Sequence, residues 1–104
     1  MFTSSDAPRV YIEDENITLT AGHEITIDCL IDANPMNLSL IQWYHNENVI
    51  NVESERFEGG TSEIVSLAIN PTIPEDAGNY YCLAENDVGE AGASNFINLE
   101  VLCK

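Results

Sequence analysis

The chain has 104 residues, 44% of them apolar, which suits one domain with a buried core and not a disordered tail. Its 18 acidic residues against 3 basic ones give a net charge of −15, which excludes nucleic acid, heparin-like polymers and anionic lipid, because each would be repelled. No apolar run approaches the roughly 18 residues of a membrane span, so direct membrane contact is not expected.

Short strands separated by turn signals, with no helical period, run through the whole chain. In chain order the predicted strands cover residues 10–12 with a continuation at 17–19, then 24–29, 38–45, 49–50, 56–57, 63–69, 79–85 and 97–101. Alternating apolar residues mark the side of these strands that is expected to be buried. The residues expected to face inward are Ile25, Ile27, Cys29, Ile41, Trp43, Val65, Leu67, Ile69, Tyr80, Cys82, Ala84, Ile97, Leu99 and Val101.

Turn residues separate the predicted strands at regular intervals. The Asn34-Pro35 pair predicts a turn, and Gly59-Gly60 is expected to turn the chain back. Residues 86–89 predict a tight hairpin in which Gly89 is free to take a positive φ. About eight short strands with such turns indicate a single all-β sandwich.

Three residues stand out at the centre of this pattern: Cys29, Trp43 and Cys82. Trp43 follows Cys29 by fourteen positions, the length of one hairpin, and Cys82 follows Cys29 by 53, far enough to lie in the opposite sheet. Tyr80 precedes Cys82 by two positions. The chain has three cysteines, so one pair with a leftover thiol is the simplest arrangement.

The segment that contains Cys82 resembles a known family. Residues 76–82, Asp-Ala-Gly-Asn-Tyr-Tyr-Cys, match the D-x-G-x-Y-x-C signature of the immunoglobulin superfamily. Residues 84–89, Ala-Glu-Asn-Asp-Val-Gly, match the A-x-N-x-x-G continuation typical of its intermediate, or I-set, subtype, and Leu67, Ile69 and Ile73 also look like that subtype. The resemblance runs from about residue 8 to residue 102, so residues 1–7 and 103–104 are expected to be tails.

This resemblance implies a two-sheet, Greek-key immunoglobulin-like sandwich of the I-set type, with structural roles for the matched residues. Cys29 and Cys82 would form a disulfide between the sheets with Trp43 packed against it, worth roughly 4 kcal/mol in the chain-entropy model. Tyr80 would be the tyrosine corner, bonded to backbone in the preceding turn. Asp76, in the same motif as Gly78, would pair with an arginine, for which Arg56 is the candidate. None of these residues would be catalytic.

Metal and cofactor chemistry has little support in the sequence. His23 and His45 lie on separate predicted strands without an obvious third ligand, so exposed strand histidines are expected. The acidic run at residues 13–15 could hold calcium, but a solvated acidic edge that blocks edge-to-edge aggregation is the favoured interpretation. No cofactor is expected.

Two kinds of modification are suggested by short motifs. Asn16-Ile17-Thr18 and Asn37-Leu38-Ser39 are acceptor sequons for N-glycosylation, provided that the protein is secreted. Cys103 lies outside the family pattern. It is interpreted first as a free thiol, second as a link to a partner chain or module, and last as a replacement for one of the core pair.

The segment after Trp43 mixes aromatic, polar and apolar residues at a predicted sheet edge. By resemblance it would lie on the sheet face that often binds partners in this superfamily, although ordinary solvent exposure explains it equally well. The residues of this predicted partner face are Tyr44, His45, Asn46, Asn48, Val49 and Ile50.

The resulting functional hypothesis is a non-catalytic module that binds a protein, homophilically or heterophilically, or that spaces neighbouring modules in an extracellular adhesion molecule or receptor. The first residues have neither the basic nor the apolar region of a secretory leader, so a secreted protein would have to be longer than this chain. The alternative is a cytoplasmic, sarcomeric scaffolding module of a titin- or twitchin-like muscle protein, in which the cysteines would stay reduced. The isolated domain is expected to be a monomer.

Overall fold

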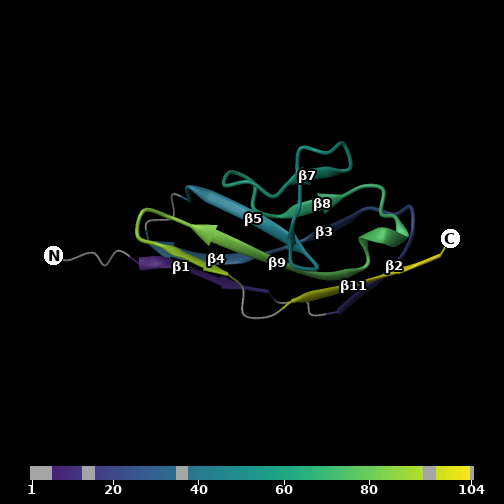
Figure 1. The fold of residues 1–104 in the computed structure, drawn as a ribbon, viewed down its shortest axis with the longest axis horizontal. Helices are drawn as coiled ribbons and strands as arrows, with labels where there is room; N and C mark the ends of the chain where they lie inside the picture. Colours follow the sequence, from purple (N-terminus) through teal and green to yellow (C-terminus); the bar gives the residue numbers. More distant parts are fainter. Residues whose placement is uncertain (1–5, 13–15, 35–37, 93–95, 104) are drawn as a thin grey trace.

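A computed structural model describes residues 6–12, 16–34, 38–92 and 96–103, and Figure 1 shows that they form a β-structure. The strands are β1 (Asp6–Tyr11), β2 (Asn16–Thr20), β3 (Ile25–Ile27), β4 (Leu30–Asn34), β5 (Leu40–His45), β6 (Asn48–Val49), β7 (Phe57–Gly59), β8 (Leu67–Ile69), β9 (Gly78–Glu85), β10 (Glu90–Gly92) and β11 (Ile97–Leu102). Over these residues the only helical element is one 3-10 turn, η1 (Pro74–Asp76). No helix of the described ranges has the length and apolarity of a membrane span.

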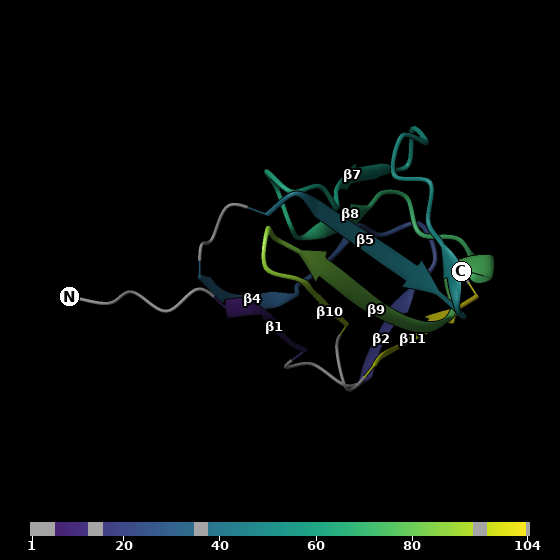
Figure 2. The same cartoon turned by 60° about the vertical axis from the view of Figure 1, so that its left-hand side comes forward.

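The strands form two layers that face one another. The larger layer has the order β2-β11-β9-β5-β6, with β10 extending the pairing of β9. The smaller layer has the order β3-β8-β7, and β1 pairs with β4 beside it. Figure 1 shows β3, β8 and β7 above β9 and β11, and Figure 2 shows β5, β9 and β11 following one another across the larger sheet. The predicted all-β, immunoglobulin-like sandwich is therefore confirmed.

The space between the layers is filled by apolar side chains from both sheets. Trp43 is fully buried at its centre and lies opposite Cys82 in the β5–β9 register, while its indole N–H donates to the backbone oxygen of Val65 at 2.8 Å. The disulfide between Cys29 and Cys82 links the two layers beside this indole. Burying large apolar side chains in this way is the main source of stability in a sandwich of this size.

The predicted strand at residues 24–29 is shorter, since β3 ends at Ile27, and β4, which was not predicted, follows it with a different pairing partner. β3 pairs with β8, whereas β4 pairs with β1, and Asp28 and Cys29 lie at the bend between them. Of the turn predicted at Asn34-Pro35, Asn34 belongs to β4, where its backbone is opposite Asp6, and Pro35 lies outside the described residues. Extended backbone there gains ladder hydrogen bonds that the residue preferences did not reveal.

The predicted strand at residues 63–69 is also shorter, since β8 begins at Leu67. The backbone N–H of Thr61 donates to the oxygen of Ile64, and the N–H of Ile64 donates to the Thr61 hydroxyl, so residues 61–64 close a local turn instead. Ile64 is exposed, and Val65 is half-buried where full burial was expected. A threonine hydroxyl that bonds nearby backbone competes with strand pairing in this way.

The hairpin at residues 86–89 is present, but Gly89 is not among the positive-φ glycines of the described chain. The side-chain oxygen of Asn86 closes the turn by accepting hydrogen bonds from the N–H groups of Val88 and Gly89. Asn86 is itself buried, so the turn is fixed by a side-chain cap and not by backbone freedom at glycine.

Candidate functional site

One pocket of about 420 Å³ lies beside the turn η1 and contains most of the polar residues singled out by the family motif. Its centre is Asp76, whose carboxylate accepts hydrogen bonds from both terminal nitrogens of Arg56, at 2.7 and 3.2 Å. The same carboxylate also accepts the backbone N–H of Ile73 at 2.8 Å. The Asp76 side chain is 6% exposed and that of Arg56 is 29% exposed, so this is a partly buried, two-pronged ion pair.

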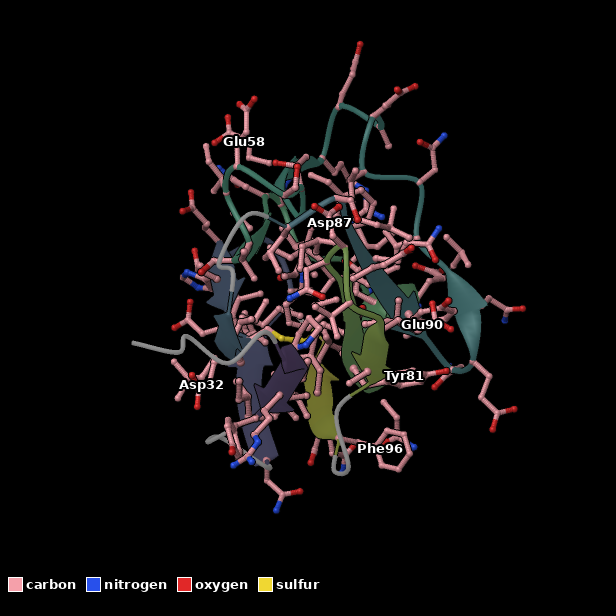
Figure 3. The ribbon with its side chains drawn as sticks, turned by 90° about the vertical axis from the view of Figure 1, so that its left-hand side faces the viewer. Asp32, Glu58, Tyr81, Asp87, Glu90 and Phe96 are labelled. Carbon is pink, nitrogen blue, oxygen red and sulfur yellow. A yellow bond between two sulfur atoms is a disulfide. The ribbon has the colours of Figure 1, made fainter. Side chains whose placement is uncertain are left out.

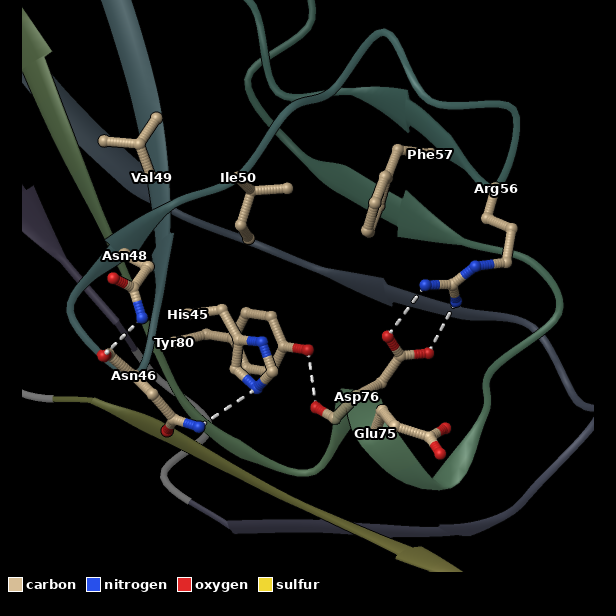
Figure 4. A pocket seen from close by; sticks show the side chains of 10 residues that line it. All are labelled: His45, Asn46, Asn48, Val49, Ile50, Arg56, Phe57, Glu75, Asp76 and Tyr80. Carbon is tan, nitrogen blue, oxygen red and sulfur yellow. Dashed lines mark hydrogen bonds and ion pairs between the residues drawn. The ribbon is translucent and has the colours of Figure 1, made fainter.

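Two stacked aromatic rings, those of His45 and Tyr80, line the pocket beside Asp76, as Figure 4 shows. The buried Tyr80 hydroxyl donates to the backbone oxygen of Asp76, and the ring of His45 is stacked on the Tyr80 ring with centroids 4.5 Å apart. Nε2 of His45 lies 2.8 Å from the backbone oxygen of Ala77. Burial, assisted by the negative charge of Asp76, raises the pKa of Tyr80 well above its usual value. The hydrogen bond to Asp76 raises the pKa of Arg56, so its positive charge is permanent.

The buried polar groups of this pocket are already bonded to the fold. Asp76 binds a guanidinium and a backbone amide, while the Tyr80 hydroxyl and His45 Nε2 are bonded to backbone oxygens. Over the described residues no buried side-chain nitrogen or oxygen lacks a hydrogen-bond partner, and no three potential metal ligands are grouped together. These bonds fix the end of the sandwich.

The two histidines differ from the prediction of exposed strand residues. His23 is exposed but lies in a bend between β2 and β3, where its backbone oxygen accepts hydrogen bonds from the hydroxyl and N–H of Thr72. His45 is on a strand but is half-buried, because its ring covers Tyr80. The sequence alone does not reveal that the His45 ring stacks on Tyr80 or that His23 lies outside a strand.

Five of the six residues predicted as one partner face, all except Tyr44, line the pocket beside Asp76, and that they bind a partner stays a prediction. Successive strand residues point to opposite faces. Tyr44 therefore points outward, while His45, Asn48 and Ile50 line the pocket beside Asp76. Val49 is opposite Tyr44 in the register, and 56% of its surface is exposed at the sheet edge.

The outer face of the larger sheet carries a row of aromatic side chains that the prediction missed in part. The Tyr44 and Tyr81 rings are stacked with centroids 4.7 Å apart, and Phe96 meets Tyr81 edge-on at 5.5 Å. Figure 3 shows Tyr81 and Phe96 next to one another at the surface. Half of the Phe96 surface is exposed. The alternation of β9 would have indicated that Tyr81 points outward, but it would not have located Phe96 beside it.

A row of asparagines crosses the same face of the sheet beside the aromatic row. In the register Asn16 is opposite Asn98, and Asn98 is opposite Asn79. The amide of Asn98 donates to the side-chain oxygen of Asn16 at 3.4 Å, and the N–H of Asn79 donates to the side-chain oxygen of Asn46 at 3.0 Å. All four are exposed, so the outer face presents amides next to aromatic rings.

The predicted modification sites lie at the margins of the described chain. Asn16 and Thr18 of the first sequon are both exposed on the edge strand β2. Cys103 is an exposed free thiol directly after β11. Asn37, of the second sequon, and the acidic run at 13–15 lie outside the described residues.

Comparisons with known proteins give one family over most of the chain. Residues 7–86 match the family model described as the immunoglobulin domain. The chain is 34% identical over 77 residues to the smooth-muscle myosin light chain kinase of Gallus gallus. It is 31% identical over 99 residues to the muscle M-line assembly protein unc-89 of Caenorhabditis elegans. It is 31% identical over 93 residues to the basement membrane-specific heparan sulfate proteoglycan core protein of Mus musculus.

These alignments cover 74%, 91% and 89% of this chain, respectively, but only 4%, 1% and 2% of the three relatives. The chain therefore spans a small part of the curated relatives that it matches.

Solved structures agree with the fold. The tandem Ig repeats of Dlar superpose with a TM-score of 0.78 at 26% identity, over 93% of this chain and 49% of that one. In the complex of Dpr2 Ig1-Ig2 with DIP-Theta Ig1-Ig3, the matching chain gives a TM-score of 0.74 at 25% identity, over 94% of this chain and 33% of that one. Given the matched family model, the disulfide beside Trp43 and the two-layer sandwich, the chain belongs to the immunoglobulin domain family.

Proposed function

We propose that the chain is a non-catalytic, protein-binding or spacer module of a multidomain extracellular adhesion molecule or receptor. The observation that carries the binding role is the aromatic row on the outer face of the larger sheet, in which Phe96 is exposed and Tyr81 and Tyr44 are half-buried. Aromatic side chains supply large contact areas at little cost in conformational entropy, and they are enriched at protein–protein interfaces. In the related Dpr2–DIP-Theta complex, domains of this fold bind one another.

An oxidising, extracellular setting is supported by two features of the chain. The first is the disulfide between Cys29 and Cys82, since such bonds persist mainly in secreted proteins. The second is the exposure of Asn16 and Thr18, because a sequon must be reachable for a glycan to be attached. The similarity to a basement membrane proteoglycan favours the same setting.

The alternative is a scaffolding module of an intracellular muscle protein. The similarities to a smooth-muscle kinase and to a muscle M-line assembly protein favour it. The assignment to the I-set subtype rests on the sequence motifs and does not separate the two settings, because both kinds of protein use that subtype.

Mass spectrometry of the protein from its native source, without reduction, separates the two settings. If the protein is extracellular, we expect Cys29 and Cys82 to be joined by a disulfide, which leaves Cys103 as the one free thiol of this segment. We also expect a glycan on Asn16. Three free thiols and an unmodified Asn16 would instead assign the module to the cytoplasm.

The binding role is tested separately with a fluorescent multimer of the chain on cells of the source tissue. We expect staining that Phe96→Ser abolishes and that Ile64→Ser leaves unchanged, because Ile64 is equally apolar and exposed but lies in the turn at residues 61–64, away from the outer face. Equal staining by both variants would show that the aromatic row is not the binding surface. No staining by any form would leave only the spacer role.

A further inference from the structure

A second, smaller pocket of about 260 Å³ opens on the outer face beside the aromatic row. It is lined by Asn46, Glu47, Asn79, Tyr81 and Phe96. We propose that this pocket receives an arginine side chain from the protein partner. The inference rests on the proposed binding function and adds the chemistry of the residue that the partner must present.

The walls of the pocket are held in place by the turn between β5 and β6. Asn46 and Glu47 have φ values of 49° and 71°, as the central residues of a tight hairpin turn require. The backbone N–H of Asn46 donates to the oxygen of Asn79 at 2.9 Å, and the N–H of Asn79 donates back to the Asn46 side chain. The turn is thus fastened to β9, which carries Tyr81, so the backbone of Glu47 is held at a fixed position relative to the Tyr81 ring without a partner.

The chemistry of the lining suits a planar cation. The exposed carboxylate of Glu47 makes no ion pair or hydrogen bond to any described side chain, so it is available to accept a pair of N–H groups. The Phe96 ring, half of whose surface is exposed, offers π-surface on which a guanidinium can lie, whereas the Tyr81 ring is already stacked on Tyr44. The Asn79 side-chain amide is also without a described partner and can accept a further N–H. A guanidinium can bind the carboxylate, the aromatic surface and the amide at once. An ammonium is not planar and has no pair of parallel N–H groups.

The net charge of the molecule also favours a partner with a basic surface. The net charge of −15 attracts a basic surface over long distances. Glu85 and Glu90 are opposite one another in the β9–β10 register, so the rim of the outer face is acidic as well. A second copy of this chain is a poor occupant because two bodies of charge −15 repel one another, although the exposed Arg9 of such a copy is not bound as Arg56 is. The partner is therefore a different protein with arginine on its surface.

The test is a titration of the ¹⁵N-labelled chain, followed by two-dimensional NMR at pH 7 and constant ionic strength. The probe is N-acetyl-arginine methylamide, compared with the citrulline and lysine analogues, which lack the charge and the planar fork respectively. We expect saturable shifts at Glu47, Asn79, Tyr81 and Phe96 with arginine, weaker ones with lysine and none with citrulline. Glu47→Gln should weaken arginine binding about threefold to fivefold, as expected for one exposed, two-pronged ion pair.

The matched control is Glu63→Gln, which removes the same charge at an exposed site in the turn at residues 61–64, away from the pocket. It should leave arginine binding unchanged. Equal weakening by both variants, equal shifts with citrulline, or no saturable shift in the pocket would each overturn the proposal. If the multimer stains cells while the arginine probe fails, the pocket assignment is wrong and the binding function stands. If the probe binds while staining is absent, the proposed function fails and the pocket has no physiological partner.

Discussion

The side-chain amide of Asn46 lies against the α-carbon of Gly78 and fills the space that a side chain at that position would need. Gly78 has a φ of 136°, which lies in the region that residues with a side chain avoid. This contact joins the turn after β5 to the start of β9. The glycine of the family signature is therefore required both by its backbone conformation and by the asparagine that covers it.

Replacing Gly78 with alanine should lower the free energy of unfolding by about 1–3 kcal/mol, because the new methyl group adds strain at a positive φ and displaces the Asn46 amide. Urea unfolding followed by Trp43 fluorescence measures the change. Gly92→Ala is the control, since the nearest atom to its added carbon is an ordinary 3.8 Å away and its φ is not positive. Equal stability of the two variants would contradict the role given to Asn46.

Removing the carboxylate of Asp76 should lower the free energy of unfolding by more than replacing its partner Arg56 does. Asp76→Asn should cost roughly 1–3 kcal/mol, because a nearly buried group then no longer matches the guanidinium of Arg56 and the N–H of Ile73. Arg56→Lys should cost about 1 kcal/mol, since it keeps the charge but loses the two-pronged geometry at a partly exposed position. Chemical denaturation provides both values. A loss of similar size in Glu75→Gln, the exposed carboxylate next door, would show that general charge is responsible.

The raised pKa of Tyr80 predicts a loss of stability in alkali. Its contribution is complete below pH of about 10, where the unfolded tyrosine ionises, and it declines as the pH rises toward the folded pKa, because the unfolded state then releases the proton that the folded state retains. Urea unfolding from pH 8 to pH 11 should show a steeper fall for the natural chain than for Tyr80→Phe. The variant should also be about 1 kcal/mol less stable at pH 7, because it lacks the hydrogen bond to Asp76. Parallel pH curves for the two proteins would rule out this linkage.

Opening the disulfide should destabilise the sandwich without changing its fold. Cys29→Ala combined with Cys82→Ala should cost about 2–4 kcal/mol, mainly because the unfolded chain regains the freedom of a long loop. Thermal unfolding with and without a reductant measures the same quantity in the natural chain. Cys103→Ser should leave stability unchanged under both conditions, because this thiol is exposed and unpaired. A shift in that variant would assign Cys103 a part in the fold.

The core could be predicted from the sequence, because it depends on residues whose spacing along each strand is regular. The inward positions of Tyr80, Cys82 and Ala84 follow from alternation alone, and all three are buried. The short turn at residues 61–64 was missed because a threonine hydroxyl bonds nearby backbone there, and such a bond leaves no periodic signal.

The outer face could be predicted only in part, because it depends on which strands are neighbours and on their register. Alternation gives the side on which Tyr44 lies, but not that Tyr81 is stacked against it or that Phe96 follows. The same holds for the pocket, which Glu47 of the turn after β5 lines together with Tyr81 of β9 and Phe96, the residue before β11. Register is set by tertiary packing and turn geometry, so a single sequence does not contain it in readable form.

The asparagine row has a consequence for how this surface can be imitated or recognised. Asn16, Asn98 and Asn79 are neighbours in space but come from three separate strands, and no continuous stretch of the chain carries more than one member of the row. A synthetic peptide copied from any one strand will therefore not compete for a ligand of the outer face. Antibodies raised against the folded domain at this site will recognise a discontinuous epitope, which disappears on a denaturing blot.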